Sequence, residues 1–141
     1  MDNPDDTIIK AILEKSKTVA VVGLSPKKER DSYKVAAYLQ KHGYDIIPVY
    51  PREEKILGAK VFRELADIPG QVDIVNVFRR SDQVMPVVEQ AIRLKPKAIW
   101  LQLGIVNEEA AMLAESKGIV FVMNRCIKIE HERLLGDVRC M

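Results

Sequence analysis

The chain has 141 residues, of which 48% are hydrophobic and 30% are charged, and its formal net charge is +2. This composition is typical of a globular protein with one core and argues against disorder. No apolar run approaches the length of a membrane span, and the acidic, polar start of the chain is unlike a secretory signal. Basic residues are interleaved with acids, which gives no case for nucleic acid. We expect one domain, residues 1–141, in the cytoplasm, with neither a membrane nor a nucleic-acid partner.

Hydrophobic periodicity predicts alternating helices and strands in the first half of the chain. Asp5 or Asp6 caps a first helix through about Lys15, which buries Ile8, Ile9, Ile12 and Leu13. The apolar run 18–22 predicts a strand covered on both faces. Asp31 or Ser32 caps the next helix, which ends at His42-Gly43. A strand over 45–50 follows, although Pro48 is unusual inside a strand.

The second half continues the alternation after an irregular segment, 51–69, which has a short strand at 60–62 and a helical turn near Glu64. Strands are predicted at 72–78, 98–103 and 119–123. Helices are predicted from Ser81 or Asp82, after an Asn107 cap and within 127–135. Such units imply an α/β, Rossmann-like, doubly wound three-layer sandwich with a mostly parallel sheet of five to six strands. Its ligands sit at the carboxyl ends of the strands, where the strand order reverses.

The loop after the strand at 18–22 lies where a Rossmann fold binds a pyrophosphate. Free amides at a helix N-terminus favour an anion, and Lys27, Lys28 and Arg30 add positive charge. The loop has one glycine and is not a G-x-G-x-x-G motif. The phosphate-binding interpretation uses Gly23, Leu24, Ser25, Pro26, Lys27, Ser32 and Tyr33. The alternative is a solvated surface loop.

The loop after the second strand begins Tyr50-Pro51-Arg52. A nicotinamide dinucleotide site usually has an acid at this place, which accepts bonds from the ribose hydroxyls. Arg52 would instead attract a phosphorylated ribose, as in coenzyme A or NADP. Glu53 or Glu54 would reverse this argument by turning inward, and an exposed arginine on a turn is the alternative.

The third and fourth loops offer further ligand contacts. Arg79 and Arg80 stand beside a helix start and form a plausible anion site, and Phe78 could pack against an adenine or a pantetheine chain. Gln102 could bond the amides of that chain. The alternatives are a salt-bridged surface pair beside a core Phe, and a satisfied amide at the edge of the core.

The last loop contains Cys126, and His131 follows. The pair could form a nucleophile or a metal site, but no orienting partner, oxyanion hole or zinc spacing accompanies it. A half-buried loop cysteine and a solvated helix face carrying Glu130, His131, Glu132 and Arg133 are the favoured interpretation. Cys126 and Cys140 are too few for a disulfide scaffold, and we expect reduced thiols.

Several ordered stretches together resemble the small coenzyme A-binding domain proteins, whose domain is similar to the nucleotide-binding N-terminal domain of the succinyl-CoA synthetase alpha subunit. The resemblance runs from about Thr18 to Leu134. The matching stretches are 19–26, 29–32, 43–51, 65–69, 73–80, 98–104, and 124–126 with 130–131.

The resemblance implies coenzyme A in the groove at the sheet end. The segment of Gly23, Ser25, Pro26 and Lys27 would hold the phosphate end. Tyr50, Pro51 and Arg52 would lie near the adenosine, and Phe78, Arg79, Arg80 and Gln102 would line the rest. The family often has Asn at the position of Tyr50, so the bulkier Tyr would stack on adenine or narrow the groove.

The resemblance also limits the chemistry. The synthetase uses a phosphorylated histidine and an ATP-grasp partner, and the sequence has no second domain long enough for either. No acid, base and nucleophile combine into another site. We therefore expect a binding, carrier or regulatory module for coenzyme A or an acyl-CoA, with a second copy or a protein as a further partner. The alternatives are an NADP-dependent oxidoreductase and an interaction module without a ligand.

Overall fold

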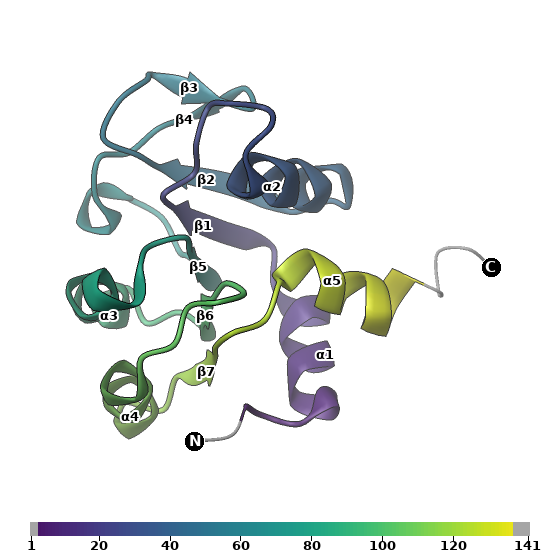
Figure 1. Cartoon of the computed structure of the whole chain (residues 1–141), viewed down its shortest axis with the longest axis vertical. Helices are drawn as coiled ribbons and strands as arrows, with labels where there is room; N and C mark the ends of the chain where they lie inside the picture. Colours follow the sequence, from purple (N-terminus) through teal and green to yellow (C-terminus); the bar gives the residue numbers. More distant parts are fainter. Residues whose placement is uncertain (1–2, 137–141) are drawn as a thin grey trace.

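A parallel β-sheet forms the centre of the molecule, as the computed structural model shows for residues 3–136 (Figure 1). Its five strands lie in the order β2-β1-β5-β6-β7, and all neighbouring pairs are parallel. The strands are β1 (Thr18–Val22), β2 (Asp45–Val49), β5 (Ile74–Val77), β6 (Ala98–Leu101) and β7 (Val120–Val122). The expected α/β, Rossmann-like, doubly wound fold is confirmed.

Helices cover both faces of the sheet (Figure 1). One face carries α1 (Asp6–Lys15), α2 (Asp31–Lys41) and α5 (Ile127–His131). The other carries α3 (Val84–Arg93), α4 (Glu108–Ser116) and the 3-10 turn η1 (Leu65–Asp67). The short elements that remain are the hairpin β3 (Lys55–Ile56) with β4 (Ala59–Lys60), the 3-10 turn η2 (Ser81–Gln83) and the π-helical turn η3 (Glu132–Gly136). None of the helices within residues 3–136 is long and apolar enough to span a bilayer.

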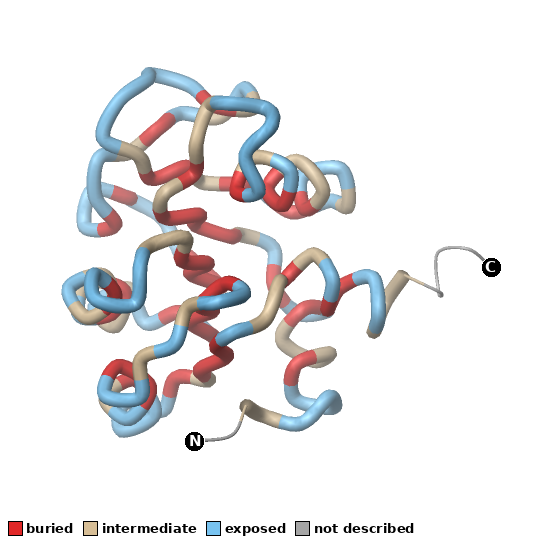
Figure 2. Tube along the Cα trace, in the orientation of Figure 1, coloured by how far each residue is buried: buried red, intermediate tan, exposed pale blue. Residues whose placement is uncertain are grey.

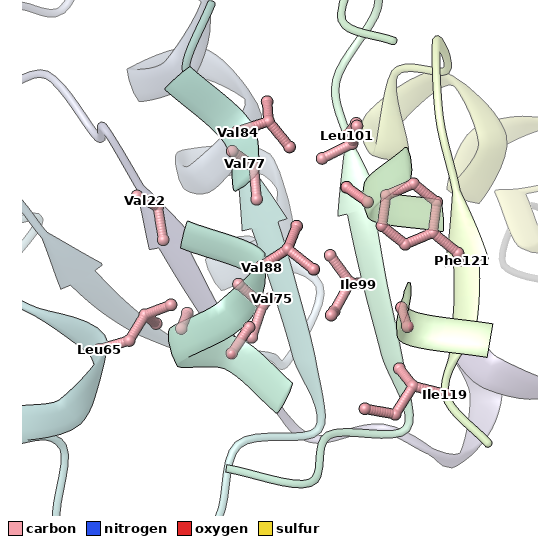
Figure 3. Close-up of a cluster of buried hydrophobic side chains, with 14 of the residues drawn as sticks. Val22, Leu65, Val75, Val77, Val84, Val88, Ile99, Leu101, Ile119 and Phe121 are labelled. Carbon is pink, nitrogen blue, oxygen red and sulfur yellow. The ribbon is translucent and has the colours of Figure 1, made fainter. Parts of the chain in front are cut away.

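Two apolar layers, one on each face of the sheet, form the core. Because side chains alternate along a strand, Val19 and Val21 face α1, α2 and α5, whereas Ala20 and Val22 face α3 and α4. Buried residues follow the strands and the inner sides of the helices (Figure 2). Figure 3 shows the layer on the face of α3 and α4, in which α3 packs Val88 against β5.

Three local expectations differ from the structure. Ile8 is 44% exposed, because the face of α1 that meets the core is centred on Ile9 and Leu13. Neither Asp31 nor Ser32 caps α2: the N-cap residue is Arg30, which makes no side-chain capping bond. The strand expected at 60–62 is divided between β4 and a parallel bridge from Phe62 to Val49.

The strand order reverses between β1 and β5. From β1 the chain passes through α2 to β2 at one edge of the sheet, and from β5 it passes through α3 and α4 toward β7 at the other. The loops after β1 and β5 therefore leave neighbouring strands toward opposite faces. A crevice at this point is the usual ligand site of open α/β sheets.

At the amino-terminal ends of the strands, the carboxylate of Asp73 joins the start of β5 to the start of β1. Asp73 is only 8% exposed. Its Oδ2 accepts hydrogen bonds from the backbone amides of Lys17, at 2.7 Å, and Thr18, at 3.2 Å. The Lys97 ammonium lies 3.9 Å from Oδ1. Burial opposes ionisation of this carboxyl, but the amides and the ammonium outweigh burial, so the pKa of Asp73 lies below its ordinary value.

We expect Asp73→Asn to lower the free energy of unfolding at pH 7 by about 1 to 3 kcal/mol, as is typical for hydrogen bonds to a charged group. A pKa that is lower in the folded state stabilises the protein above the unfolded pKa of about 3.9, and this contribution is lost as the pH falls. Urea unfolding at pH 7 and pH 3 measures both effects. The variant should lose less stability on acidification than the wild type, whereas Asp67→Asn, at an exposed acid, should behave like the wild type. Equal acid dependence of Asp73→Asn and the wild type would contradict this role.

Candidate functional site

The loops after β1, β2 and β5 meet at Gly23. Its amide donates to the carbonyl of Val49 at 2.9 Å, and the Phe78 amide donates to the carbonyl of Val22 at 2.8 Å. Gly23 has a φ of +86°, and a Cβ built on it would stand 2.5 Å from the Phe78 carbonyl oxygen. Only glycine fits this position without displacing the loop after β5.

The loop between β1 and α2 closes on itself. The Ser32 hydroxyl oxygen accepts from the amide of Ser25 at 3.0 Å, and the Ser25 hydroxyl oxygen accepts from the amide of Lys27 at 3.1 Å. The amide of Lys34 donates to the Arg30 carbonyl and so begins the hydrogen-bond ladder of α2. The amides that precede Lys34 in the first turn have no carbonyl partner within the helix. The side chain of the N-cap residue, Arg30, does not cap them either. These amides and the helix dipole favour an anion at the loop.

Two adjoining cavities lie at the carboxyl ends of the strands. The central hollow, of about 700 Å³, lies between α2, the loops after β5 and β6, and the start of α5. The loop hollow, of about 590 Å³, lies against the loop from β1 to α2 and the end of β2. Asp31 and Phe78 line both, so the two hollows form one groove across the point where the strand order reverses.

Most of the predicted site residues line this groove. Phe78, Arg79, Arg80 and Gln102 line the central hollow. Gly23, Ser25, Lys27, Ser32, Tyr50 and Phe78 line the loop hollow. Leu24 is fully buried in the core, so only its backbone could meet a ligand there. Pro26, Tyr33, Pro51 and Arg52 are not among the lining residues of either hollow.

The loop after β2 is organised by a residue that the sequence did not single out. The Arg63 guanidinium donates to the carbonyl oxygens of Tyr50, Arg52 and Glu53, at 3.2, 2.8 and 2.8 Å. Nothing in the sequence distinguishes Arg63 from other exposed arginines, because its partners are backbone carbonyls brought near by the hairpin. The bonds hold the Tyr50 end of the groove in a defined shape.

Cations dominate the central hollow. Arg79 and Arg80 were predicted, whereas Lys34 and Lys128 were missed and come from the first turn of α2 and from α5. Asp31 is the acidic residue in the lining. Lys34 could have been found from its place three residues after Asp31 on the same helix face. Arg80 also pairs with Asp82 at 3.4 Å, and Lys128 lies 4.0 Å from Glu132. The smaller surplus of positive charge that is left fits an anionic ligand.

A buried amide pair connects the sheet to the wall of the groove. Asn76 is fully buried, and its Nδ2 donates to the carbonyl of Trp100 and to Gln102 Oε1, each at 3.4 Å. Gln102 Oε1 also accepts from the backbone amide of Ile127 at 3.4 Å. These backbone partners define which atom of each amide is oxygen. The Nε2 of Gln102 is left to face the central hollow.

The expectation of a solvated face at 130–133 is wrong for Glu130 and His131, which are 4% and 2% exposed. His131 Nδ1 lies 2.8 Å from the Tyr38 hydroxyl, and its ring contacts those of Tyr38, His42 and Tyr44. Cys126, in contrast, is half-buried as expected and lines the central hollow. In residues 3–136 no three potential metal ligands come together.

Glu130 joins α5 to α1 through an ionic network. Its carboxylate lies 2.6 Å from Arg125 and 3.1 Å from Arg133, and Arg133 pairs with Asp6 at 2.7 Å. Burial opposes ionisation of Glu130, but the two guanidinium groups outweigh it and hold the pKa of this carboxyl below its ordinary value. The network therefore fixes residues 125–133, which include Cys126, against α1.

Comparison with known proteins places these features in context. Residues 17–132 match the family model of the CoA binding domain. The chain is 45% identical over 131 residues to YneT, an uncharacterized protein of Bacillus subtilis. These residues make up 93% of this chain and 97% of YneT. It superposes on a solved hypothetical protein from Pyrococcus horikoshii with a TM-score of 0.92, 43% identity and 96% of both chains covered. A segment of 60 residues, 42% of this chain, is 35% identical to 13% of the alpha subunit of an ADP-forming acetate–CoA ligase from Pyrococcus furiosus.

We expect Gly23→Ala to destabilise the protein more than Gly104→Ala. Both glycines have a φ of +86°, so both substitutions carry the backbone cost of about 1 to 2 kcal/mol. A Cβ at position 104 has no atom within 4 Å, whereas one at position 23 meets the Phe78 carbonyl, which adds about 1 to 3 kcal/mol. Urea unfolding of the ligand-free variants measures the difference. If the two variants lost equal stability, the close approach of the two loops would be disproved.

Proposed function

Because the chain belongs to the CoA-binding domain family, we propose that it binds coenzyme A or an acyl-CoA in the groove at the carboxyl ends of β1, β5 and β6. The observation that carries the proposal is that two adjoining hollows lie at the reversal of strand order and share Asp31 and Phe78. Such a groove suits a long, two-ended ligand better than a compact one.

The phosphorylated adenosine end belongs in the loop hollow. That hollow lies at the start of α2, where amides without helical partners and the helix dipole favour phosphate. Lys27 and Arg30 line it and add charge, against Glu29 and Asp31. Tyr50 lines the same hollow and offers a ring for stacking on adenine. The exposed Arg52 lies two residues after Tyr50 and adds attraction toward a ribose phosphate.

The pantetheine arm belongs in the central hollow. Phe78 lies at the junction of the two hollows and gives the arm an apolar surface. Gln102 presents an amide donor for one of the carbonyl groups of the arm. Arg79 and Arg80, in the loop after β5, are placed to pair with phosphates that cross the junction.

The role that fits such a site is a cytoplasmic carrier, sensor or partner subunit. The residues that line the groove can bind anions and amides. A Cys126 and His131 pair, which was the disfavoured interpretation of the sequence, has no support, because His131 is buried against Tyr38. A second copy of the chain or another protein would then be the partner that uses the bound coenzyme. A retained domain that binds no ligand is the competing proposal, and heating with and without coenzyme A separates the two.

We expect coenzyme A to raise the melting temperature and to bind more weakly as salt screens the phosphate contacts. Arg79→Ala should weaken binding by about 1 to 3 kcal/mol, which corresponds to roughly 5- to 150-fold in Kd. Arg52→Ala, at an exposed position, should weaken binding less. Calorimetric titration measures these changes.

The matched control is Arg93→Ala, at an exposed arginine in the last turn of α3, away from the groove. It should bind coenzyme A as the wild type does. Unchanged binding by both Arg79→Ala and Arg52→Ala would show that the groove is misplaced. Binding of NADPH without binding of coenzyme A would favour an oxidoreductase instead.

A further inference from the structure

The backbone around Cys126 is held by hydrogen bonds in the wall of the central hollow. The residue before it is anchored because Trp100 Nε1 donates to the Arg125 carbonyl at 2.9 Å. The residue after it is anchored because the Ile127 amide donates to Gln102 Oε1. The carbonyl of Cys126 itself accepts from the amide of Glu130 at 3.0 Å. The side chain therefore projects from a backbone that is bonded on both sides, and Cys126 lines the hollow.

A second observation at the same place points to a ligand. Gln102 is 93% buried, and its oxygen is taken by Asn76 Nδ2 and the Ile127 amide. Its Nε2 has no protein partner among residues 3–136, and the residue lines the hollow. This nitrogen is not among the fully buried atoms without a partner, so it stays open to the hollow, where a carbonyl oxygen of a ligand can accept its hydrogen bond.

The two groups match one end of coenzyme A. In the coenzyme the last amide group is joined through its nitrogen and an ethylene link to the terminal thiol, so its carbonyl lies a few bonds from the sulfur. In the protein an amide donor and a thiol line the same hollow, and the Gln102 side chain bonds the residue that follows Cys126. A ligand whose terminal carbonyl accepts from Gln102 Nε2 would bring its sulfur to Cys126.

We propose that Cys126 exchanges with a disulfide of coenzyme A, so that the protein and the coenzyme become joined as a mixed disulfide. This inference rests on the proposed function, since it uses the same groove. The Cys126 thiolate attacks the coenzyme-side sulfur of a disulfide CoA–S–S–R. The new Cys126–S–S–CoA bond forms as the old S–S bond breaks, R–S⁻ leaves and takes a proton, and no separate oxidant is needed.

The surroundings of Cys126 select this disulfide over others. Lys34, Arg79, Arg80 and Lys128 line the same hollow and attract the phosphates of the coenzyme. Glutathione disulfide lacks these phosphates and an arm that fits the groove. Exchange with the coenzyme disulfide then proceeds within a bound complex, where the effective concentration is high.

The experiment incubates the reduced full-length chain with coenzyme A disulfide or with glutathione disulfide at equal concentration and follows the adduct by intact mass and peptide mapping. We expect the coenzyme adduct to form on Cys126 at least about tenfold faster than the glutathione adduct, because binding precedes exchange. Dithiothreitol should remove it, and excess desulfo-coenzyme A, which lacks the sulfur, should suppress its formation. Cys126→Ser should abolish this adduct, whereas Cys140→Ser should retain it.

Gln102→Ala tests the positioning role. It should slow exchange with coenzyme A disulfide more than exchange with glutathione disulfide, because the loss of the Ile127 anchor affects both reactions, whereas the loss of the Nε2 donor affects only the coenzyme. A general change in thiol access would slow both reactions equally. Equal rates with the two disulfides, no effect of desulfo-coenzyme A, or an adduct confined to Cys140 would overturn the proposal. Heating the reduced wild type with desulfo-coenzyme A separates the two levels: a raised melting temperature without exchange refutes only the exchange, and no shift refutes the proposed function as well.

Discussion

The close approach of Gly23 to the Phe78 carbonyl sets the spacing of the two loops that leave the sheet where its strand order reverses. The loop after β1 turns toward α2 on one face, and the loop after β5 turns toward α3 on the other. A Cβ at position 23 would displace the Phe78 carbonyl, and Phe78 lines both hollows. The position of the residue that the two hollows share therefore depends on glycine at position 23.

The amino-terminal and carboxyl-terminal ends of the strands differ in how their charges are balanced. At the amino-terminal edge Asp73 gathers the amides of Lys17 and Thr18 with the Lys97 ammonium, so charge is balanced inside the protein. At the carboxyl-terminal edge the cations of the central hollow outnumber its acids, and the Nε2 of Gln102 faces the hollow. An anionic ligand with amide groups supplies what that edge lacks.

The sequence predicted most of the fold because β1, β5, β6 and β7 are apolar runs that both layers of helices cover. It failed where partners are distant in the chain. The exposure of Ile8 depends on how α1 sits on the core, and the burial of His131 depends on Tyr38, 93 residues away. The cap of α2 was mistaken because the Ser32 hydroxyl turns to the amide of Ser25 instead.

The site was predictable in outline and not in detail. The rule that ligands bind at the carboxyl ends of parallel strands pointed to Phe78, Arg79 and Gln102, and these line the central hollow. Lys34 was missed because the rule points to loops, whereas this residue reaches the hollow from a helix. Arg63 was missed because its partners are carbonyls of another loop, which no motif encodes. The nearness of Gln102 to the Cys126 segment was not predictable, because it depends on a hydrogen bond between two different loops.

Backbone amide chemical shifts, followed by NMR during a titration with coenzyme A, show whether loops from separate strands receive one molecule of coenzyme A. Binding in the groove should produce shifts that saturate together in residues 23–33, 78–81, 102–105 and 125–129, with residues 16–18 and 71–73 at the opposite ends of the strands unchanged. Shifts concentrated at those opposite ends, or no saturable shifts, would contradict it.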